Sequence, residues 1–489
     1  MLKTNPRKSE RGQAIVLIAV AMVGLIAMVG LMTDGGMMLI EYGKLKRAVD
    51  AASISASQQF RRGFTGADLS TAAETFLNLN QSDAANINVY RCKRDPDTGT
   101  LDTSTDGTLH DETLCTLPRR KLVRVEATRT VQFGFMRVLG FTSANLTTSA
   151  VGEAASIDMV LIIDTSASMA YETYAGGNGN IPDHPSEDPS ACNASISNPC
   201  EPLDTVKNVA DEFLDNMFFP YDRVSIVAMT NQSPNAPNRD HVTVIGLDDN
   251  ESAVRTALGN LRVYQPPACD WGSPANPANG PCINYTSGTF IGLDCPIYRL
   301  GVDLLANTGD EVNNISSCNS SNIGGAFRRA ALEFTNGLVR EDSLWIVLAL
   351  AGGPANATDS FPGYLDGFCP TSTWNSLTNP FCRDASAVSR HSNGDANYDA
   401  DDYARDMADY LADPVTGQGV TVFTIGLGNL IRNASKGDAT AGEQLLEYAA
   451  ETAGGVSANH GEYFFSPNSS GLAAIFDAIA RNIFTRISR

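Results

Sequence analysis

The sequence predicts an α/β protein with a doubly wound, mostly parallel sheet, preceded by a single transmembrane helix and a small α+β module. Three observations predict this class. An uncharged apolar segment lies near the N-terminus, a short mixed pattern of helix and strands follows it, and the remaining two thirds alternate short apolar runs with amphipathic segments. We expect four parts: a cytoplasmic basic segment (1–13), a transmembrane helix (14–33), a helix with a small α+β module (34–155) and an α/β domain (156–489).

Composition narrows the class of function. Lys and Arg number 35 against 55 Asp and Glu, so the net charge is −20 in a chain of 489 residues. Nucleic-acid binding depends on neutralising phosphates with basic side chains, so this balance argues against it. Hydrophobic residues make up 43% and charged residues 18%, which is typical of a folded chain.

The apolar segment runs from Ala14 to Met32 without a charged residue. A helix of this length, at about 1.5 Å per residue, nearly crosses the ~30 Å hydrocarbon core of a bilayer. A cleaved signal peptide is the alternative, but the run is long for one and the residues after Leu31 offer no small-x-small cleavage site. The preceding basic side chains are Lys3, Arg7, Lys8 and Arg11. By the positive-inside rule they keep the N-terminus in the cytoplasm, so we expect an extracytoplasmic location at the cell envelope or surface for the bulk of the chain.

Apolar residues continue at helical spacing beyond the anchor, which predicts one long helix to about Phe60. The segments Arg11–Val16, Thr33–Gly36 and Ala48–Ala52 resemble the N-terminus of TadE/TadG-like proteins of the Tad (Flp) pilus system. The resemblance implies pilus or secretion-system subunits as partners. Tad pseudopilins are processed after a Gly with a Glu shortly downstream, whereas Leu17 stands at that place here, so the unprocessed, TadG-like form is expected.

The module after this helix is expected to serve as a spacer or a pilin-like assembly surface, because no titratable cluster in it suggests chemistry. Its expected elements are a helix at Ala67–Leu79 and strands at Asn86–Cys92, Lys121–Val131 and Asn145–Ala154.

The α/β domain is predicted from alternating runs. Apolar runs typical of buried parallel strands lie at Ile157–Ile163, Arg223–Met229, His241–Leu247, Leu344–Leu350, Val420–Ile425 and Glu462–Phe465. Helical patterns lie between and after them, at Leu203–Met217, Ser252–Leu261, Gly325–Leu338, Tyr403–Leu411, Glu443–Ala453 and Leu472–Ile483.

A metal-site motif follows the first of these strands. Asp164, Ser166 and Ser168 place three oxygen side chains at alternate positions of a turn, and hard oxygens suit Mg²⁺, Mn²⁺ or Ca²⁺. With a strand before it and a helix after it, the motif resembles the metal-ion-dependent adhesion site (MIDAS) of von Willebrand factor A (VWA) domains, which have a Rossmann-like fold. The resemblance covers about residues 156–489, including Gly419–Gly428.

The VWA resemblance implies two further ligands. The family's Thr falls on Ser321, which keeps the hydroxyl, and its Asp falls on Ala351, which cannot ligate. Asp359, in the following loop, is a possible substitute carboxylate. The implied cofactor is Mg²⁺ or Mn²⁺, with Ca²⁺ also possible. The alternative is a vestigial site in which Asp164 and Ser168 only cap the helix.

The ten cysteines indicate an oxidising compartment, and disulfides between sequential neighbours are one hypothesis among many connectivities. The sequential pairs are Cys92–Cys115, Cys192–Cys200, Cys269–Cys282, Cys295–Cys318 and Cys369–Cys382. The last four lie in three insertions, at about 170–200, 262–320 and 352–397. All three rise from the ligand-binding edge of the sheet, where they would form a set of disulfide-linked loops around the metal site. The alternative is that they are surface loops without a binding role.

An acidic segment and the five histidines are the other candidate metal ligands, and we expect neither to form a metal site. Residues 395–406 imitate the ligand positions of an EF-hand, but Ala400 replaces the turn glycine, and an acidic first helical turn fits Asp401–Asp406 as well. None of the five histidines has metal-ligand spacing; they are His110, His184, His241, His391 and His460.

The expected function is therefore that of a membrane-anchored binding protein of a Tad-like pilus or surface adhesion system, which engages a protein or matrix ligand through a degenerate MIDAS. The alternative is a purely structural pilus-assembly subunit whose metal-free VWA domain packs against partners. An enzyme is not expected, because no nucleophile stands beside a base in a known motif.

Overall fold

The computed structural model describes most of the chain. The described residues are 11–60, 63–80, 83–95, 98–177, 179, 184–193, 195–229, 242–263, 283–286, 289–293, 321–335, 340, 343–355, 400–432 and 442–487. The chain forms two compact units, Met1–Ala154 and Ala155–Arg489. The division lies next to the expected start of the α/β domain at residue 156.

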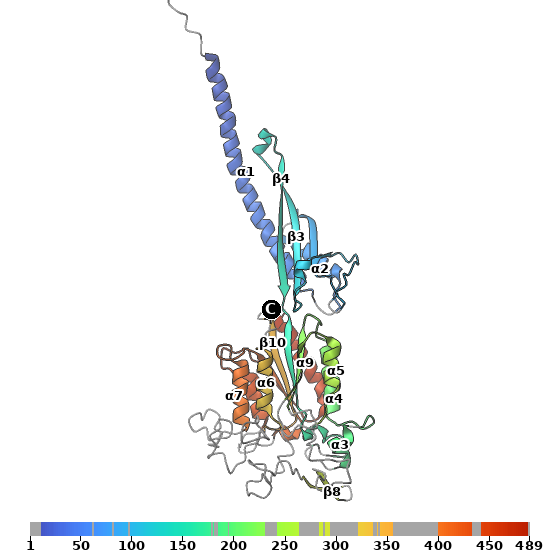
Figure 1. The fold of residues 1–489 in the computed structure, drawn as a ribbon. Helices are drawn as coiled ribbons and strands as arrows, with labels where there is room; N and C mark the ends of the chain where they lie inside the picture. Colours follow the sequence, from blue (N-terminus) through green and yellow to red (C-terminus); the bar gives the residue numbers. More distant parts are fainter. Residues whose placement is uncertain are drawn as a thin grey trace, which may run out of the picture. The chain divides into compact units, whose positions relative to one another are not determined.

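The first unit combines two helices with a four-stranded sheet of order β2-β1-β3-β4 (Figure 1). Its elements are α1 (Arg11–Ser57), α2 (Gly66–Asn80), β1 (Ala85–Arg91), β2 (Leu109–His110), β3 (Lys121–Gln132) and β4 (Ser143–Ala154). Strands β3 and β4 form a long antiparallel hairpin, paired in register from Lys121 opposite Ala154 to Gln132 opposite Ser143. Because the side chains of a strand alternate between its faces, one face of this hairpin is buried and the other is exposed.

Helix α1 has two different halves. From Ile15 to Met32 its large apolar side chains are exposed, whereas Leu45, Val49 and Ala52 are fully buried against the rest of the unit. The part of this helix from Ala14 onward is long and apolar enough to cross a membrane, with a mean hydropathy of 2.9 in its most apolar window. An exposed, uniformly apolar helical surface is unfavourable in water, so the first half of α1 needs an apolar surrounding.

The second unit is built on a six-stranded sheet of order β12-β11-β10-β5-β6-β7, parallel except for the edge strand β7. Its strands are β5 (Ile157–Ile163), β6 (Arg223–Ala228), β7 (Val242–Asp248), β10 (Leu344–Ala351), β11 (Thr421–Leu427) and β12 (Tyr463–Ser466). Its helices are α3 (Pro189–Cys192), α4 (Leu203–Leu214), α5 (Glu251–Gly259), α6 (Ile323–Glu333), α7 (Ala400–Ala412), α8 (Gly442–Glu451) and α9 (Leu472–Ile487), and a separate hairpin pairs β8 (Ile283–Thr286) with β9 (Thr289–Leu293). The predicted doubly wound α/β class is confirmed.

Two hydrophobic cores cover the two faces of this sheet. Helices α4 and α5 lie on one side and α6 and α7 on the other (Figure 1). On β5, Leu161 and Ile163 join the first core while Val160 and Ile162 join the second, because successive side chains point to opposite faces. Burial on both faces explains why β5 is an uninterrupted apolar run.

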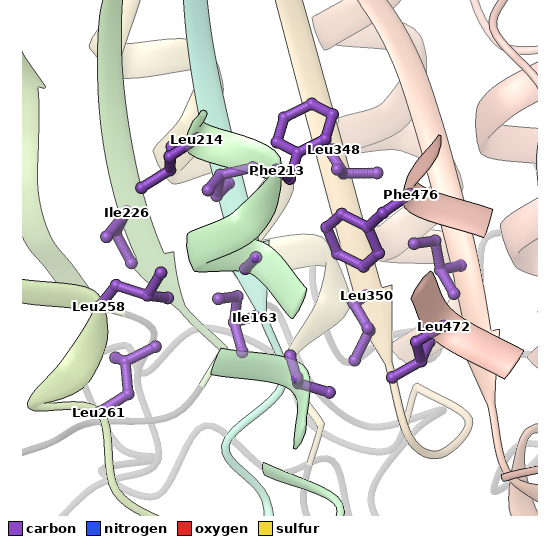
Figure 2. Packing of buried hydrophobic residues seen from close by; sticks show 14 of the residues in the cluster. Ile163, Phe213, Leu214, Ile226, Leu258, Leu261, Leu348, Leu350, Leu472 and Phe476 are labelled. Carbon is purple, nitrogen blue, oxygen red and sulfur yellow. The ribbon is translucent and has the colours of Figure 1, made fainter. Parts of the chain in front are cut away.

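The first core is closed by aromatic side chains from α4 and α9. Figure 2 shows Phe213 and Phe476 beside the strand residues Leu348 and Leu350. The two rings meet edge to face, with centroids 5.6 Å apart and planes at 71°. Such packing fixes the strands, and therefore the edge at which they end, in a single arrangement.

Candidate metal centre

The candidate site lies where β5, β10 and the start of α6 meet. Asp164 follows β5 directly, and its backbone N–H continues the sheet by donating to the carbonyl of Leu350 at 3.0 Å. Ser166 and Ser168 lie on the turn that begins the short 3-10 helix η3 (Ala167–Ala170), and Ser321 immediately precedes α6. The carboxyl edge of a parallel sheet is where open α/β folds bind ligands.

Local sequence fixes the start of α6. Asn322 is its N-cap, and the side-chain oxygen of Asn322 accepts a hydrogen bond from the backbone N–H of Gly325 at 2.8 Å. Gly324 lets α6 approach α7 closely, because a Cβ there would lie 2.6 Å from a ring carbon of Tyr403. Together these contacts hold the backbone of Ser321 at the sheet edge.

The four oxygen-bearing side chains converge. Ser321 Oγ donates to Asp164 Oδ2 at 3.1 Å and lies 3.4 Å from Ser166 Oγ, while Ser166 Oγ and Ser168 Oγ are 2.9 Å apart. Backbone N–H groups also reach the carboxylate, that of Ser166 at Oδ1 (2.8 Å) and that of Gly352 at Oδ2 (2.7 Å). The structure thus brings together all four residues that the sequence singles out, from segments more than 150 positions apart.

Asp164 is fully buried, and its neighbours are neutral groups. Burial raises the pKa of its carboxyl, and the hydrogen bonds from Ser166, Gly352 and Ser321 offset this only in part. Among the described residues, no Lys or Arg forms an ion pair with Asp164. A buried carboxylate with hydroxyl neighbours and no basic partner is the kind of group that a cation stabilises.

Asp158, at the other end of β5, shows the contrast. It is also fully buried, but Arg223 donates to both of its carboxylate oxygens, at 2.9 and 2.7 Å, and Arg340 pairs with it as well. Burial opposes ionisation, yet the two guanidinium groups outweigh it and lower the pKa of the Asp158 carboxyl. Asp158 is neutralised within the protein, and Asp164 is not.

The donor set fits a hard divalent cation. One carboxylate and three hydroxyls are oxygen donors of the type that Mg²⁺ and Mn²⁺ accept, and such ions keep some waters or bind oxygens of a partner. Because the set contains only one carboxylate, we expect its affinity for the cation to be lower than that of a site with two or three carboxylates.

The position of the missing carboxylate differs from the expectation. Ala351 packs in the second hydrophobic core, on the face of β10 that also carries Ala349. A Cβ on Gly352, by contrast, would lie 3.3 Å from Ser168 Oγ and 3.5 Å from Asp164 Oδ2. The residue that faces the cluster is therefore Gly352 and not Ala351, a correction of one position along the strand.

Other sequence-predicted features are only partly within the described residues. Asp359 lies outside them, so its role as a substitute ligand stays a prediction. Two of the sequential cysteine pairs, Cys92–Cys115 and Cys192–Cys200, are disulfides in the structure. The other six cysteines also lie outside the described residues; they are Cys269, Cys282, Cys295, Cys318, Cys369 and Cys382.

The acidic segment at 395–406 is described only from Ala400 onward, where it forms the first turns of α7. Asp401 is buried and pairs with Arg405 one turn later. This contact supports the helical interpretation of these acidic residues over the calcium loop.

In the first unit, the side chains of His110, Glu112 and Cys115 lie close enough together to be considered as ligands of a metal ion. Cys115 is bonded to Cys92, so its sulfur is not a thiolate, and Glu112 already pairs with Arg94 at 2.7 Å. This grouping therefore does not compete with the Asp164 cluster as a metal centre.

A cavity of about 390 Å³ opens at the carboxyl ends of β11 and β12. Its lining is mainly polar and comprises Glu172, Tyr174, Ala175, Gly177, Gly179, Gly428, Asn429, Pro467 and Asn468. Glu172 is anchored in it by the backbone N–H of Ser469, at 3.2 Å. The cavity thus lies at the same edge of the sheet as the Asp164 cluster.

No known protein family matches the sequence, and no curated protein is similar to it. Solved structures that are similar to this chain include the PilB minor pilin from Streptococcus sanguinis, at 11% identity over 90% of this chain and 94% of that one, with a TM-score of 0.33. The vWF domain of the type V pili tip protein Mfa5 from Porphyromonas gingivalis matches at 13% identity over 69% of this chain and 97% of that one, also with a TM-score of 0.33.

A third similar structure is proximal thread matrix protein 1 from the mussel byssus with a zinc-occupied MIDAS motif. It has 12% identity, covers 68% of this chain and 46% of its own, and has a TM-score of 0.30. This chain thus spans about half of the mussel protein.

Proposed function

We propose that this protein is a membrane-anchored, extracytoplasmic binding protein whose second unit holds Mg²⁺ or Mn²⁺ at Asp164, Ser166, Ser168 and Ser321. The observation that carries the proposal is the fully buried Asp164 carboxylate, which three hydroxyls and two backbone N–H groups surround without a basic partner among the described residues. A cation would supply the compensating charge there.

The shortage of carboxylates suits a binding role. A bound cation with few protein carboxylates retains positive character and attracts an acidic group from outside. The MIDAS resemblance implies the same chemistry, in which a carboxylate of the partner completes the coordination of the metal. We therefore infer that the ligand is a protein or matrix component that presents an acidic side chain, and that the protein is not an enzyme.

Anchoring through α1 supports this location. Its exposed apolar half would span the bilayer, with the basic N-terminal residues on the cytoplasmic side. The disulfides Cys92–Cys115 and Cys192–Cys200, one in each unit, fit an oxidising compartment on the far side. The resemblance of the N-terminus to TadE/TadG-like proteins makes a Tad/Flp-type pilus the system in which we place it, with pilus or secretion-system subunits as further partners.

Isothermal calorimetry on the full chain in detergent micelles tests the metal site. We expect binding heat with Mg²⁺ and Mn²⁺ for the natural chain and none at the same site for Asp164→Asn. Asp477→Asn is the matched control, because it makes the same chemical change at an exposed position on α9, in the same unit. The control should bind like the natural chain.

Two results would contradict the proposal. Equal heats for Asp164→Asn and the natural chain would place the metal elsewhere. An absence of binding to the natural chain at millimolar metal would favour the structural alternative, in which the second unit packs against pilus subunits without a cation.

A further inference from the structure

The tip of the β3–β4 hairpin, residues 133–141, is fastened to helix α1 beside the apolar half of that helix. The Asp34 carboxylate of α1 accepts three backbone hydrogen bonds from the tip, from Gly134 at 3.1 Å, Phe135 at 3.0 Å and Met136 at 2.7 Å. On the preceding turn of α1, a Cβ on Gly30 would lie 3.1 Å from the Cβ of Phe135. These contacts set the position of the tip along the helix, as Figure 1 also shows.

The tip itself is apolar and exposed. Phe135, Val138 and Phe141 are 50%, 69% and 57% exposed, and Leu139 is exposed as well. These four large apolar side chains, exposed within seven residues, make up an apolar patch of the kind that soluble surfaces avoid. The short helix η2 (Met136–Leu139) also carries one basic side chain, Arg137. Arg137 is exposed and donates a hydrogen bond to Gln132 Oε1 at 3.0 Å.

The contacts with α1 determine the environment of this apolar patch. Gly30 lies inside the uncharged run that ends at Met32, and Asp34 is the first charged residue after that run. If the run spans the bilayer, Gly30 and Asp34 bracket the boundary between hydrocarbon and headgroups, since one helical turn advances about 5.4 Å. A tip that is hydrogen-bonded to Asp34 and packed against Gly30 lies at the same depth.

We propose that the hairpin tip is a second membrane contact, which inserts Phe135, Val138, Leu139 and Phe141 into the headgroup and upper acyl region of the non-cytoplasmic leaflet. This inference rests on the proposed membrane anchoring of α1. The patch has the features of an interfacial insertion: large apolar side chains, an arginine whose head can stay at the phosphates, and a backbone whose N–H groups near the bilayer are satisfied by a carboxylate. Asp34 is then a positioning residue for the tip.

Fluorescence quenching by brominated lipids tests the proposal. The full chain is reconstituted into phosphatidylcholine vesicles brominated near the carbonyl end of the acyl chains, with Val138→Trp as the reporter. The three natural tryptophans all lie in the second unit and give a constant background. Leu101→Trp, at an exposed position of the first unit away from the tip, is the matched control.

We expect the added tryptophan at position 138 to lose about half or more of its emission and to shift to the blue, because its ring is in contact with acyl chains. The tryptophan at position 101 should not respond. In a Val138→Trp background, Asp34→Ala should reduce the quenching, since it removes the acceptor that holds the tip.

Extraction of the vesicles with alkaline carbonate distinguishes the two proposals. Release of the chain into the supernatant would refute the anchoring by α1. Retention of the chain together with an unquenched tryptophan at position 138 would overturn the tip proposal alone. A blue shift without quenching would also overturn it, because the patch would then be covered by protein, such as the helix of a neighbouring subunit.

Discussion

Two aspartates at opposite ends of β5 show how much a buried carboxylate depends on its partners. Asp158 is held by Arg223 and Arg340, whereas Asp164 is held by hydroxyls and amides. The same residue type, equally buried, forms an internal ion pair at one end of the strand and has no basic partner among the described residues at the other. The difference lies only in which side chains the neighbouring elements bring to each end.

We expect Asp158→Asn to destabilise the second unit by about 3–5 kcal/mol, because it leaves two buried guanidinium groups without their counter-charge. The folded-state pKa of Asp158 lies below its ordinary value of 3.8, so its stabilisation is present above that value and is lost as the pH falls through the folded-state pKa. The natural chain should therefore lose part of its stability on acidification below about pH 4, and the variant should lack that part of the loss.

Urea unfolding followed by tryptophan fluorescence measures the free energy of unfolding of the second unit, since all tryptophans lie in that unit. Equal stability of the variant and the natural chain at pH 7 would contradict the predicted role of Asp158.

A second residue-scale prediction concerns Gly352. Aspartate there would add a carboxylate beside Asp164 Oδ2 and Ser168 Oγ. The Met169 side chain, whose sulfur would lie 2.9 Å from the new Cβ, would have to move, and Ser168 Oγ, at 3.3 Å, would have to shift slightly. We expect Gly352→Asp to raise the affinity for Mn²⁺ about tenfold or more, which corresponds to roughly 1.4 kcal/mol, and to lower stability in EDTA through repulsion with Asp164. Gly352→Asn has the same shape without the charge, so an equal gain in affinity for the asparagine variant would refute a charge effect.

Sequence reasoning misplaced the missing carboxylate for a physical reason. Side chains alternate with a period of two along a strand, so an error of one residue moves a position from the site to the opposite core. Ala351 and Gly352 cannot be distinguished until the pairing of β10 with β5 is known, with Leu350 opposite Ile163. The motif around Asp164 did not have this ambiguity, because its three ligands lie within one turn.

At the scale of elements, strand β4 approaches helix α1 more closely than a side chain allows. A Cβ on Gly152 would lie 2.2 Å from the carbonyl oxygen of Ser53 and 2.7 Å from the backbone nitrogen of Ile54. Backbone atoms cannot rotate away as a side chain can, so any side chain at position 152 would separate the strand from the helix. This contact holds the buried half of α1 on the sheet.

We expect Gly152→Ala to destabilise the first unit by about 1–3 kcal/mol, since overpacking of a closed contact has a cost of this size. Hydrogen exchange of the backbone amides of β4 and of α1 after Leu45 should become faster by the corresponding factor. Val151→Ala, at the exposed neighbouring position on β4, is the control. Unchanged exchange in the glycine variant would show that α1 is not held by this contact.

The elements themselves were predictable where burial dictates composition. The apolar run at Ile157–Ile163 is β5 residue for residue, and the other predicted strands of the sheet begin and end within two residues of their expected bounds. The bounds of the helices differ by up to five residues, as at the end of α6. The attachment of the hairpin tip to Asp34 was not predictable, because the partners are about a hundred residues apart and no local pattern marks them. Such contacts depend on the packing of α1 against β3 and β4, which only the folded unit defines.

At the scale of the whole molecule, the chain divides its tasks between two units. The first carries the apolar helix and the hairpin tip, and the second carries the buried Asp164 carboxylate at the edge of its sheet. The proposed membrane attachment and the proposed ligand binding thus belong to separate units, and a disulfide lies in each unit. We propose above all that the buried Asp164 carboxylate holds a divalent cation.

Anomalous X-ray diffraction from crystals of the full chain soaked in Mn²⁺ tests this claim most directly. We expect an anomalous peak within about 2–2.6 Å of the Asp164 carboxylate and the seryl oxygens, because bonds between hard cations and oxygen have this length. Crystals of Asp164→Asn should show no such peak. A map without a peak at this cluster under the same soak, or with the same peak in the asparagine variant, would contradict it.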